Sequence, residues 1–194
     1  MRRAHLLAAA LMLGTITAAG PVAAEVTAQS DAGFVIKHSG EVRASQPDVW
    51  AALIAPAKWW SSEHTWSHDA ANLYLDAQAT GCFCEKLPKP AGAPADQRMG
   101  SVEHMHVIFA DPQRGVLRMT GALGPLQGEA ARGVLTITLT KTETGTRIEW
   151  EYVVGGYVRF PVAEIAPAVD QVIGEQLGRL VTLLTPAPSS APTS

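Results

Sequence analysis

The sequence contains no cluster of lysine and arginine residues. Its 15 basic side chains are spread along the chain against 18 acidic ones, which gives a net charge of −3. A mildly acidic protein of this kind is a poor partner for nucleic acid or for an anionic membrane surface. Beyond the first two dozen residues the sequence also lacks an apolar run long enough to cross a bilayer. We therefore expect no nucleic-acid partner and no stable membrane anchor.

The motifs of nucleophilic and metal catalysis are missing as well. The sequence has no Gly-x-Ser-x-Gly elbow, and neither Cys82 nor Cys84 stands at a recognisable spacing from a histidine. His64 and His68 are four residues apart, but no acidic residue stands at the spacing of a metal motif. The sequence therefore predicts no metal and no cofactor, and it names no catalytic residue.

The first 24 residues have the layout of a secretory signal peptide. A basic start is followed by an apolar stretch over residues 6–19 and by small residues before Ala24, with a second possible cut after Ala28. An uncleaved membrane anchor is the alternative, but the apolar stretch is shorter than the roughly 20 residues that span a bilayer. We expect the mature chain to start near Glu25 and to be periplasmic or secreted.

The rest of the chain fits one domain. Residues 25–33 are interpreted as an extension, residues 34–184 as the folded domain, and residues 185–194 as a disordered tail because they are rich in Pro, Ser, Ala and Thr.

Apolar periodicity predicts an α+β domain. Alternation predicts a first strand over residues 34–43, and Ser45 can cap a short helix that begins at Gln46, with another short turn at residues 57–60. Six further strands are predicted at about residues 71–77, 81–87, 101–110, 114–121, 132–142 and 146–154. A final helix over residues 162–184 carries an apolar stripe of Ile165, Val169, Val172, Leu177, Leu180 and Leu184. This helix is expected to cover the apolar face of the sheet, since neither could bury that face alone.

Several segments resemble one family. They are GCFCE at 81–85, ADP with Arg114 at 110–114, GALGPLQ at 121–127, VGGY at 154–157, VDQVI at 169–173 and QLGRL at 176–180. In this order they are similar to the START-related SRPBCC superfamily, and within it to exported members described as polyketide-cyclase-like or related to chaperone-ATPase activators. The resemblance covers residues 34–184. It implies a helix-grip fold, in which a curved seven-stranded antiparallel sheet wraps around the C-terminal helix, two short helices follow the first strand, and an internal cavity holds a hydrophobic compound such as a lipid, sterol or aromatic polyketide. It does not imply one reaction.

Tryptophan residues suggest where that cavity opens. Four of the five tryptophans fall between Trp50 and Trp66, and their amphipathic rings suit a cavity mouth as well as an ordinary core. The residues 121–128 are either a plain connection or a flexible flap at the entrance. The candidate ligand-binding residues are Trp59, Trp60, Trp66, His104, His106, Met119, Leu123, Trp150, Tyr152 and Tyr157. Met119, Trp150 and Tyr152 could instead fill the cavity.

His104 and His106 are two residues apart in a predicted strand, so we expect both on one face. If that face lines the cavity, the imidazoles can bind a ligand or act as acid and base; otherwise they are an exposed pair. Binding or transport of a hydrophobic molecule is therefore the predicted function, with a cyclase-like or hydrolase-like enzyme that uses these histidines as the alternative.

Cys82 and Cys84 are predicted to remain free thiols or to form a strained, easily reduced bond. On a regular strand their Cα atoms would stand roughly 6.5–7 Å apart, at the upper limit for a disulfide.

Overall fold

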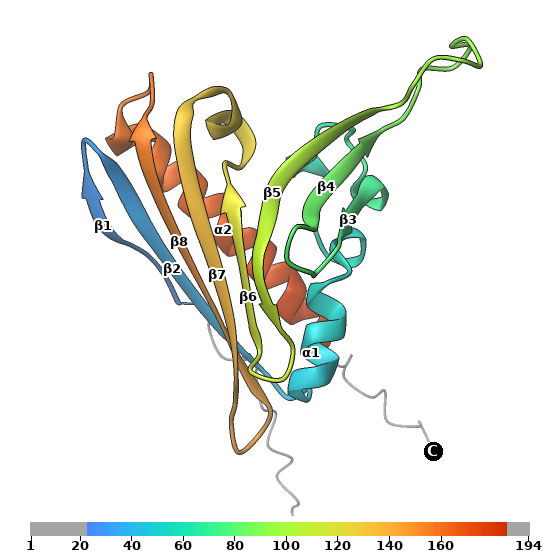
Figure 1. The fold of residues 1–194 in the computed structure, drawn as a ribbon. Helices are drawn as coiled ribbons and strands as arrows, with labels where there is room; N and C mark the ends of the chain where they lie inside the picture. Colours follow the sequence, from blue (N-terminus) through green and yellow to red (C-terminus); the bar gives the residue numbers. More distant parts are fainter. Residues whose placement is uncertain (1–22, 186–194) are drawn as a thin grey trace, which may run out of the picture.

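The computed structural model describes residues 23–185, which form a curved, open antiparallel sheet of eight strands and a long C-terminal helix (Figure 1). The strands are β1 (Ala23–Ser30), β2 (Gly33–Val42), β3 (Leu73–Leu75), β4 (Cys82–Leu87), β5 (Gly100–Asp111), β6 (Val116–Gly121), β7 (Ala130–Lys141) and β8 (Thr146–Tyr157). The α-helices are α1 (Gln46–Leu53) and α2 (Val162–Leu184). Four short 3₁₀ helices are η1 (Pro56–Lys58), η2 (Ser62–His64), η3 (Ala70–Asn72) and η4 (Gly124–Gly128).

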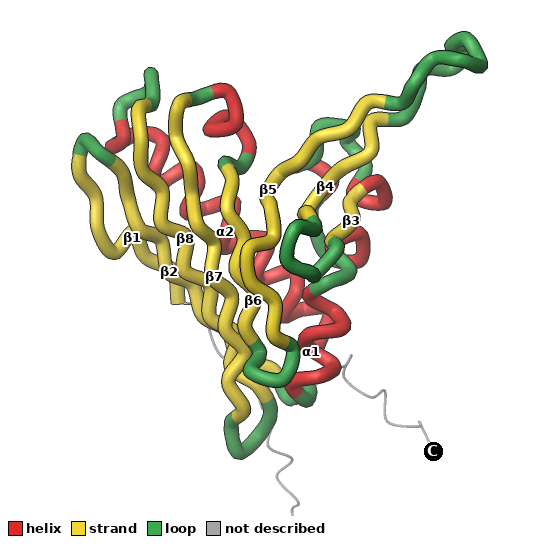
Figure 2. The backbone as a smooth tube through the Cα atoms, viewed as in Figure 1, coloured by secondary structure: helices red, strands yellow, loops and turns green. Residues whose placement is uncertain are grey.

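The strands follow the order β1-β2-β8-β7-β6-β5-β4-β3 across the sheet. Every neighbouring pair is antiparallel. Strands β3 to β8 therefore follow one another through hairpins, whereas β2 pairs with β8, the last strand in the chain. Helix α2 runs behind the sheet in Figure 1 and packs against β1 and β2. Figure 2 shows the connection between β4 and β5, residues 88–99, extending away from the rest of the sheet.

The alternation of apolar and polar residues in three strands matches the burial of their side chains. In β2 the buried side chains are Phe34, Ile36, His38 and Val42; in β7 they are Leu135, Ile137 and Leu139; in β8 they are Ile148, Trp150 and Tyr152. Charged and threonine side chains alternate with them and lie toward water. One face of the sheet therefore forms the core with α1 and α2, as the alternation requires.

Strand β1 corrects two predictions, because the sheet has eight strands instead of seven and residues 25–33 are not an extension. Glu25 pairs with Lys37 and Val26 with Ile36, so this segment protects the edge of β2. The predicted signal peptide falls largely on residues 1–22, which lie outside the described residues, as does nearly all of the predicted tail. A cut after Ala24 would keep most of β1, whereas a cut after Ala28 would remove most of it.

Both α-helices begin where the sequence predicts. The Ser45 hydroxyl accepts a hydrogen bond from the Asp48 amide at 3.4 Å and caps α1. The second short helix is a single turn, η1. Helix α2 passes through Pro167 without ending, and its core-facing residues are Ala166, Val169, Ile173, Gln176, Leu177, Leu180 and Val181. Ile165 and Val172, which the predicted stripe includes, are only half-buried. Within residues 23–185 no helix is long and apolar enough to cross a membrane.

A buried histidine ties α2 to the sheet. His38 Nε2 on β2 lies 2.8 Å from Asp170 Oδ1 on α2, and the His38 side chain is almost fully buried. The ring fits against Gly174, where a Cβ atom would come within 2.6 Å of His38 Cε1. This close approach explains why α2 has a glycine at a position where alanine would favour the helix.

Cys82 and Cys84 are joined by a disulfide bond, so the expectation of free thiols is wrong. Their Cα atoms are 5.5 Å apart, well within bonding range. The ladder is irregular beside them, because Phe83 pairs with Met105 and Cys84 with Glu103. His104 is thus the extra residue of a β-bulge, a feature that strand periodicity does not reveal.

Replacing both cysteines with alanine is expected to lower the free energy of unfolding by less than about 2 kcal/mol, because the bond closes a very short loop and removes little chain entropy from the unfolded state. Urea unfolding of the variant and the oxidised parent measures the difference. A loss of several kcal/mol would show that the bond does more than close this loop.

Candidate functional site

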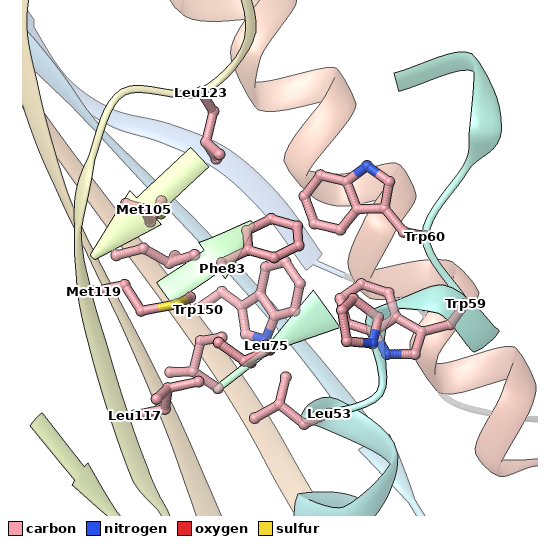
Figure 3. Close-up of a pocket in the computed structure, with 13 residues that line it drawn as sticks. Leu53, Trp59, Trp60, Leu75, Phe83, Met105, Leu117, Met119, Leu123 and Trp150 are labelled. Atoms are coloured by element: carbon pink, nitrogen blue, oxygen red, sulfur yellow. The ribbon is translucent and has the colours of Figure 1, made fainter. Parts of the chain in front are cut away.

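The space between the sheet and the helices is almost filled by side chains. Among residues 23–185, the cavity left between them has a volume of about 20 Å³, room for no more than one water molecule. Figure 3 shows Trp59, Phe83, Met105, Met119 and Trp150 turned toward one another around it. Its remaining walls are Leu53, Pro56, Trp60, Leu75, Leu117, Leu123, Leu135 and Ile137. In this structure the predicted internal cavity has no room for a lipid-sized ligand.

A larger groove opens beside this core, with a volume of about 460 Å³. One wall is the half of α2 nearer its N-terminus, the second is the segment 60–66, and the third is the loop that leads into η4. The lining residues are Trp60, Glu63, His64, Thr65, Trp66, His104, Leu123, Gly124, Pro125, Ile165, Ala168, Val169, Val172 and Ile173. The half-buried Ile165 and Val172 therefore line the groove, and Ile165 also packs against the core.

Hydrogen bonds to α2 fix the segment that carries the tryptophans. The Ser61 amide donates to Gln176 Oε1 at 2.8 Å, and Arg179 Nε donates to the Trp59 carbonyl at 2.7 Å. The Trp60 indole N–H donates to the His64 carbonyl at 3.0 Å. The face of Trp60 is thus held against the groove while its polar edge is satisfied within its own loop.

The loop before η4 is held by a buried tyrosine. The Leu123 amide donates to Tyr152 Oη at 3.3 Å, and burial raises the pKa of Tyr152 to about 12, so its hydroxyl stays protonated. Gly124 follows with a φ of 55°, in the left-handed region that favours glycine. Leu123 and Trp60 border both the groove and the small inner cavity, so these two side chains separate the two spaces.

The β-bulge turns His104 inward. His104 and the following Met105 are both buried, and the His104 ring packs against Phe83 with ring centres 5.0 Å apart. His106 points the other way: its side chain is 39% exposed, and its Nδ1 lies 3.6 Å from the Glu103 carboxylate. The prediction that His104 and His106 share a face is wrong, because the extra residue shifts the alternation between them.

Glu85 is the partner of His104. His104 Nε2 lies 3.0 Å from Glu85 Oε2, and the Glu85 side chain is fully buried. The carboxylate also accepts hydrogen bonds from the amides of Trp66 and Ser67. Burial acts to raise the pKa of Glu85, but the hydrogen bonds from Ser67, Trp66 and His104 outweigh it and the pKa is lowered. Burial lowers the pKa of His104, although Glu85 opposes that shift.

The structure divides the predicted site residues into three groups. Trp60, Trp66, His104 and Leu123 line the groove. Trp59, Met119 and Trp150 line the small inner cavity, and Tyr152 is buried behind Leu123. His106 and Tyr157, the latter 71% exposed, line neither space.

Sequence reasoning missed Glu85, because one carboxylate in a strand pattern gives no sign of its partner. Among residues 23–185, no three His, Cys, Asp or Glu side chains come together as a metal site would require.

Solved structures share this fold at low sequence identity. An uncharacterized protein from Rhizobium leguminosarum is 18% identical with a TM-score of 0.55, and the match covers 85% of this chain and 98% of that one. A protein of unknown function from Staphylococcus aureus is 14% identical with a TM-score of 0.52, covering 78% and 93%. CalU16 from Micromonospora echinospora is 14% identical with a TM-score of 0.50, covering 90% and 88%. No protein-family model and no curated protein matches the chain. The likeness concerns the fold alone.

Proposed function

We propose that the protein binds a hydrophobic small molecule in the groove between α2 and the segment 60–66. The observation that carries this proposal is an apolar groove of about 460 Å³ beside a core that is otherwise closed. Ligand pockets for drug-sized molecules span roughly 300–1,000 Å³ and are lined mainly by apolar and aromatic groups. Trp66 is 54% exposed at this groove, where a ligand can cover its ring.

The expected affinity is moderate. Burying about 300 Å² of apolar ligand surface contributes on the order of 7 kcal/mol before entropic costs, which allows micromolar binding if those costs are small. A larger ligand would have to displace Trp60 and Leu123 and enter the inner cavity. The glycine next to Leu123 gives that loop the backbone freedom such a movement needs.

The sequence resemblance and the fold together support an SRPBCC-like, helix-grip protein, with lipids, sterols or aromatic polyketides as the ligand classes to test. The leader-like first 24 residues support export to the periplasm or beyond. The bond between Cys82 and Cys84 supports the same location, since disulfides persist in oxidising compartments.

A panel of fatty alcohols, sterols and aromatic polyketides is expected to include a ligand that raises the melting temperature and changes tryptophan emission, because a molecule bound only to the folded state stabilises it. Val172→Lys places a charge in the groove and is expected to weaken that ligand's binding at least roughly tenfold.

Leu183→Lys is the matched control, since Leu183 lies on the same helix, is 45% exposed and does not line the groove. It should bind as the parent does. Equal losses in both variants, or no response to any compound, would refute the groove as the binding site.

An enzyme is the second candidate, and one observation favours it: His104 lies inward beside a buried carboxylate, as a general base requires. His106 takes no part, because it lies on the outside. Mass spectrometry after long incubation separates the two functions, since a binding protein returns its ligand unchanged and an enzyme does not.

A further inference from the structure

His104 has one hydrogen-bond partner among the described residues, and that partner fixes its tautomer. The groups that hydrogen-bond to the Glu85 carboxylate are all donors: the amides of Trp66 and Ser67, the Ser67 hydroxyl, and Nε2 of His104. An ionised carboxylate can only accept, so Nε2 carries the hydrogen. In the neutral ring Nδ1 is then a bare acceptor. The lowered pKa of His104, caused by burial, keeps the ring neutral near pH 7.

The other polar groups at the groove already have partners or lie in water. His64 Nε2 is 3.0 Å from Glu175, Thr65 Oγ1 donates to the Ser62 carbonyl at 2.8 Å, and the Trp60 indole is bonded within its loop. Glu63 is exposed. Among the described residues Nδ1 of His104 has no hydrogen-bond partner, and unlike the half-buried His64 this ring is buried where it lines the groove. Covering it with a ligand that has no donor carries a desolvation cost.

We propose that the groove selects apolar molecules that carry a hydroxyl group, an alcohol or a phenol, which donates a hydrogen bond to Nδ1 of His104. This inference rests on the proposed binding function and adds the ligand's polar group to it. Glu85 is a positioning residue, because it holds the tautomer that presents the acceptor. Methyl ethers lack the donor. Ionised carboxylates can only accept, so fatty-acid anions are disfavoured at this position.

Matched probes test the hydroxyl directly. 2-Naphthol and 2-methoxynaphthalene share one apolar body, and each is titrated against bound N-phenyl-1-naphthylamine, whose fluorescence reports displacement. The parent protein should bind 2-naphthol roughly fivefold to tenfold more tightly, the contribution of one hydrogen bond. His104→Phe keeps a ring beside Phe83 and should bind both probes alike, whereas His106→Phe should keep the preference.

A pH series on the parent protein provides a second measurement that needs no variant. Protonation turns Nδ1 into a donor, so the preference for 2-naphthol should shrink as the pH falls through the pKa of His104, below 6.5. Equal binding of both probes at pH 8, or a preference that survives His104→Phe or acid, overturns the hydroxyl assignment while the binding proposal stands. Failure of both probes and of N-phenyl-1-naphthylamine to bind overturns the two together.

Discussion

Replacing Glu85 with glutamine is expected to lower the free energy of unfolding by about 3 kcal/mol. The buried carboxylate accepts hydrogen bonds from the segment 66–67 and from His104 in a site closed to water. A glutamine side chain has one acceptor oxygen, and its NH₂ group would face a donor. Urea unfolding measures the loss, and amide exchange at Trp66 and Ser67 should quicken because the segment loses its anchor.

Glu103→Gln is the control for Glu85→Gln. The Glu103 side chain is 57% exposed, and its ion pair with His106 is a long one, 3.6 Å from Oε1 to Nδ1. This substitution should change stability by less than about 0.5 kcal/mol. Equal effects of the two substitutions would show that the buried carboxylate is no anchor.

Glu85→Gln should also change how the free energy of unfolding depends on pH in acid. His104 and Glu85 both have lowered pKa values when folded, against ordinary values of 6.5 and 4.5, so the unfolded chain takes up each proton first as the pH falls. The free energy of unfolding of the parent should therefore fall below pH 6.5 and again below pH 4.5. In Glu85→Gln the decline below pH 4.5, which belongs to Glu85, should be reduced. The decline below pH 6.5, which belongs to His104, should remain. A parent stability that does not change over this range would contradict the assignment.

Gly133→Ala is expected to lower the free energy of unfolding by about 3 kcal/mol. It should also weaken ligand binding, although Gly133 does not line the groove. A Cβ atom at this position of β7 would lie 2.3 Å from Cε2 and 2.6 Å from Oη of the fully buried Tyr152. The ring has to move, and its hydroxyl accepts the Leu123 amide at the edge of the groove. Thermal unfolding and ligand titration should both register the change.

Gly128→Ala is the matched control, because a Cβ atom there meets nothing within 4 Å. It should leave stability and binding close to those of the parent. If Gly133→Ala proved equally mild, the contact between Tyr152 and the Leu123 loop would have no role in shaping the groove.

Most of the secondary structure could be predicted because local patterns determine it. The α2 stripe, the Ser45 cap and the alternation in β7 and β8 each depend on neighbours in the sequence. Strand β1 was missed because its residues follow an apolar stretch of sequence and have weak alternation, so its pairing with β2 decides its structure. The bulges of β5 were missed for the same reason, since a partner strand defines a bulge.

The candidate site was predictable only in part. The sequence pointed to Trp60, Trp66, His104 and Leu123, because aromatic rings, imidazoles and a glycine-rich loop are informative residue types. It could not show that a bulge separates His104 from His106, or that Glu85 lies 19 residues before its partner in the chain and beside it in space. Whether the interior is open or filled depends on packing, which periodicity does not describe.

The strand order also determines how late in synthesis of the chain the sheet can be completed. The first hairpin, β1 and β2, pairs with the rest of the sheet only through β8, and the Glu41 and Arg147 pair that joins β2 to β8 is separated by 106 residues. Helix α2, which covers the same two strands, is made later still. A growing chain therefore leaves the apolar side chains of β2 unprotected until its last strand and helix emerge. The hairpin that is made first is the last part of the sheet to gain its partner.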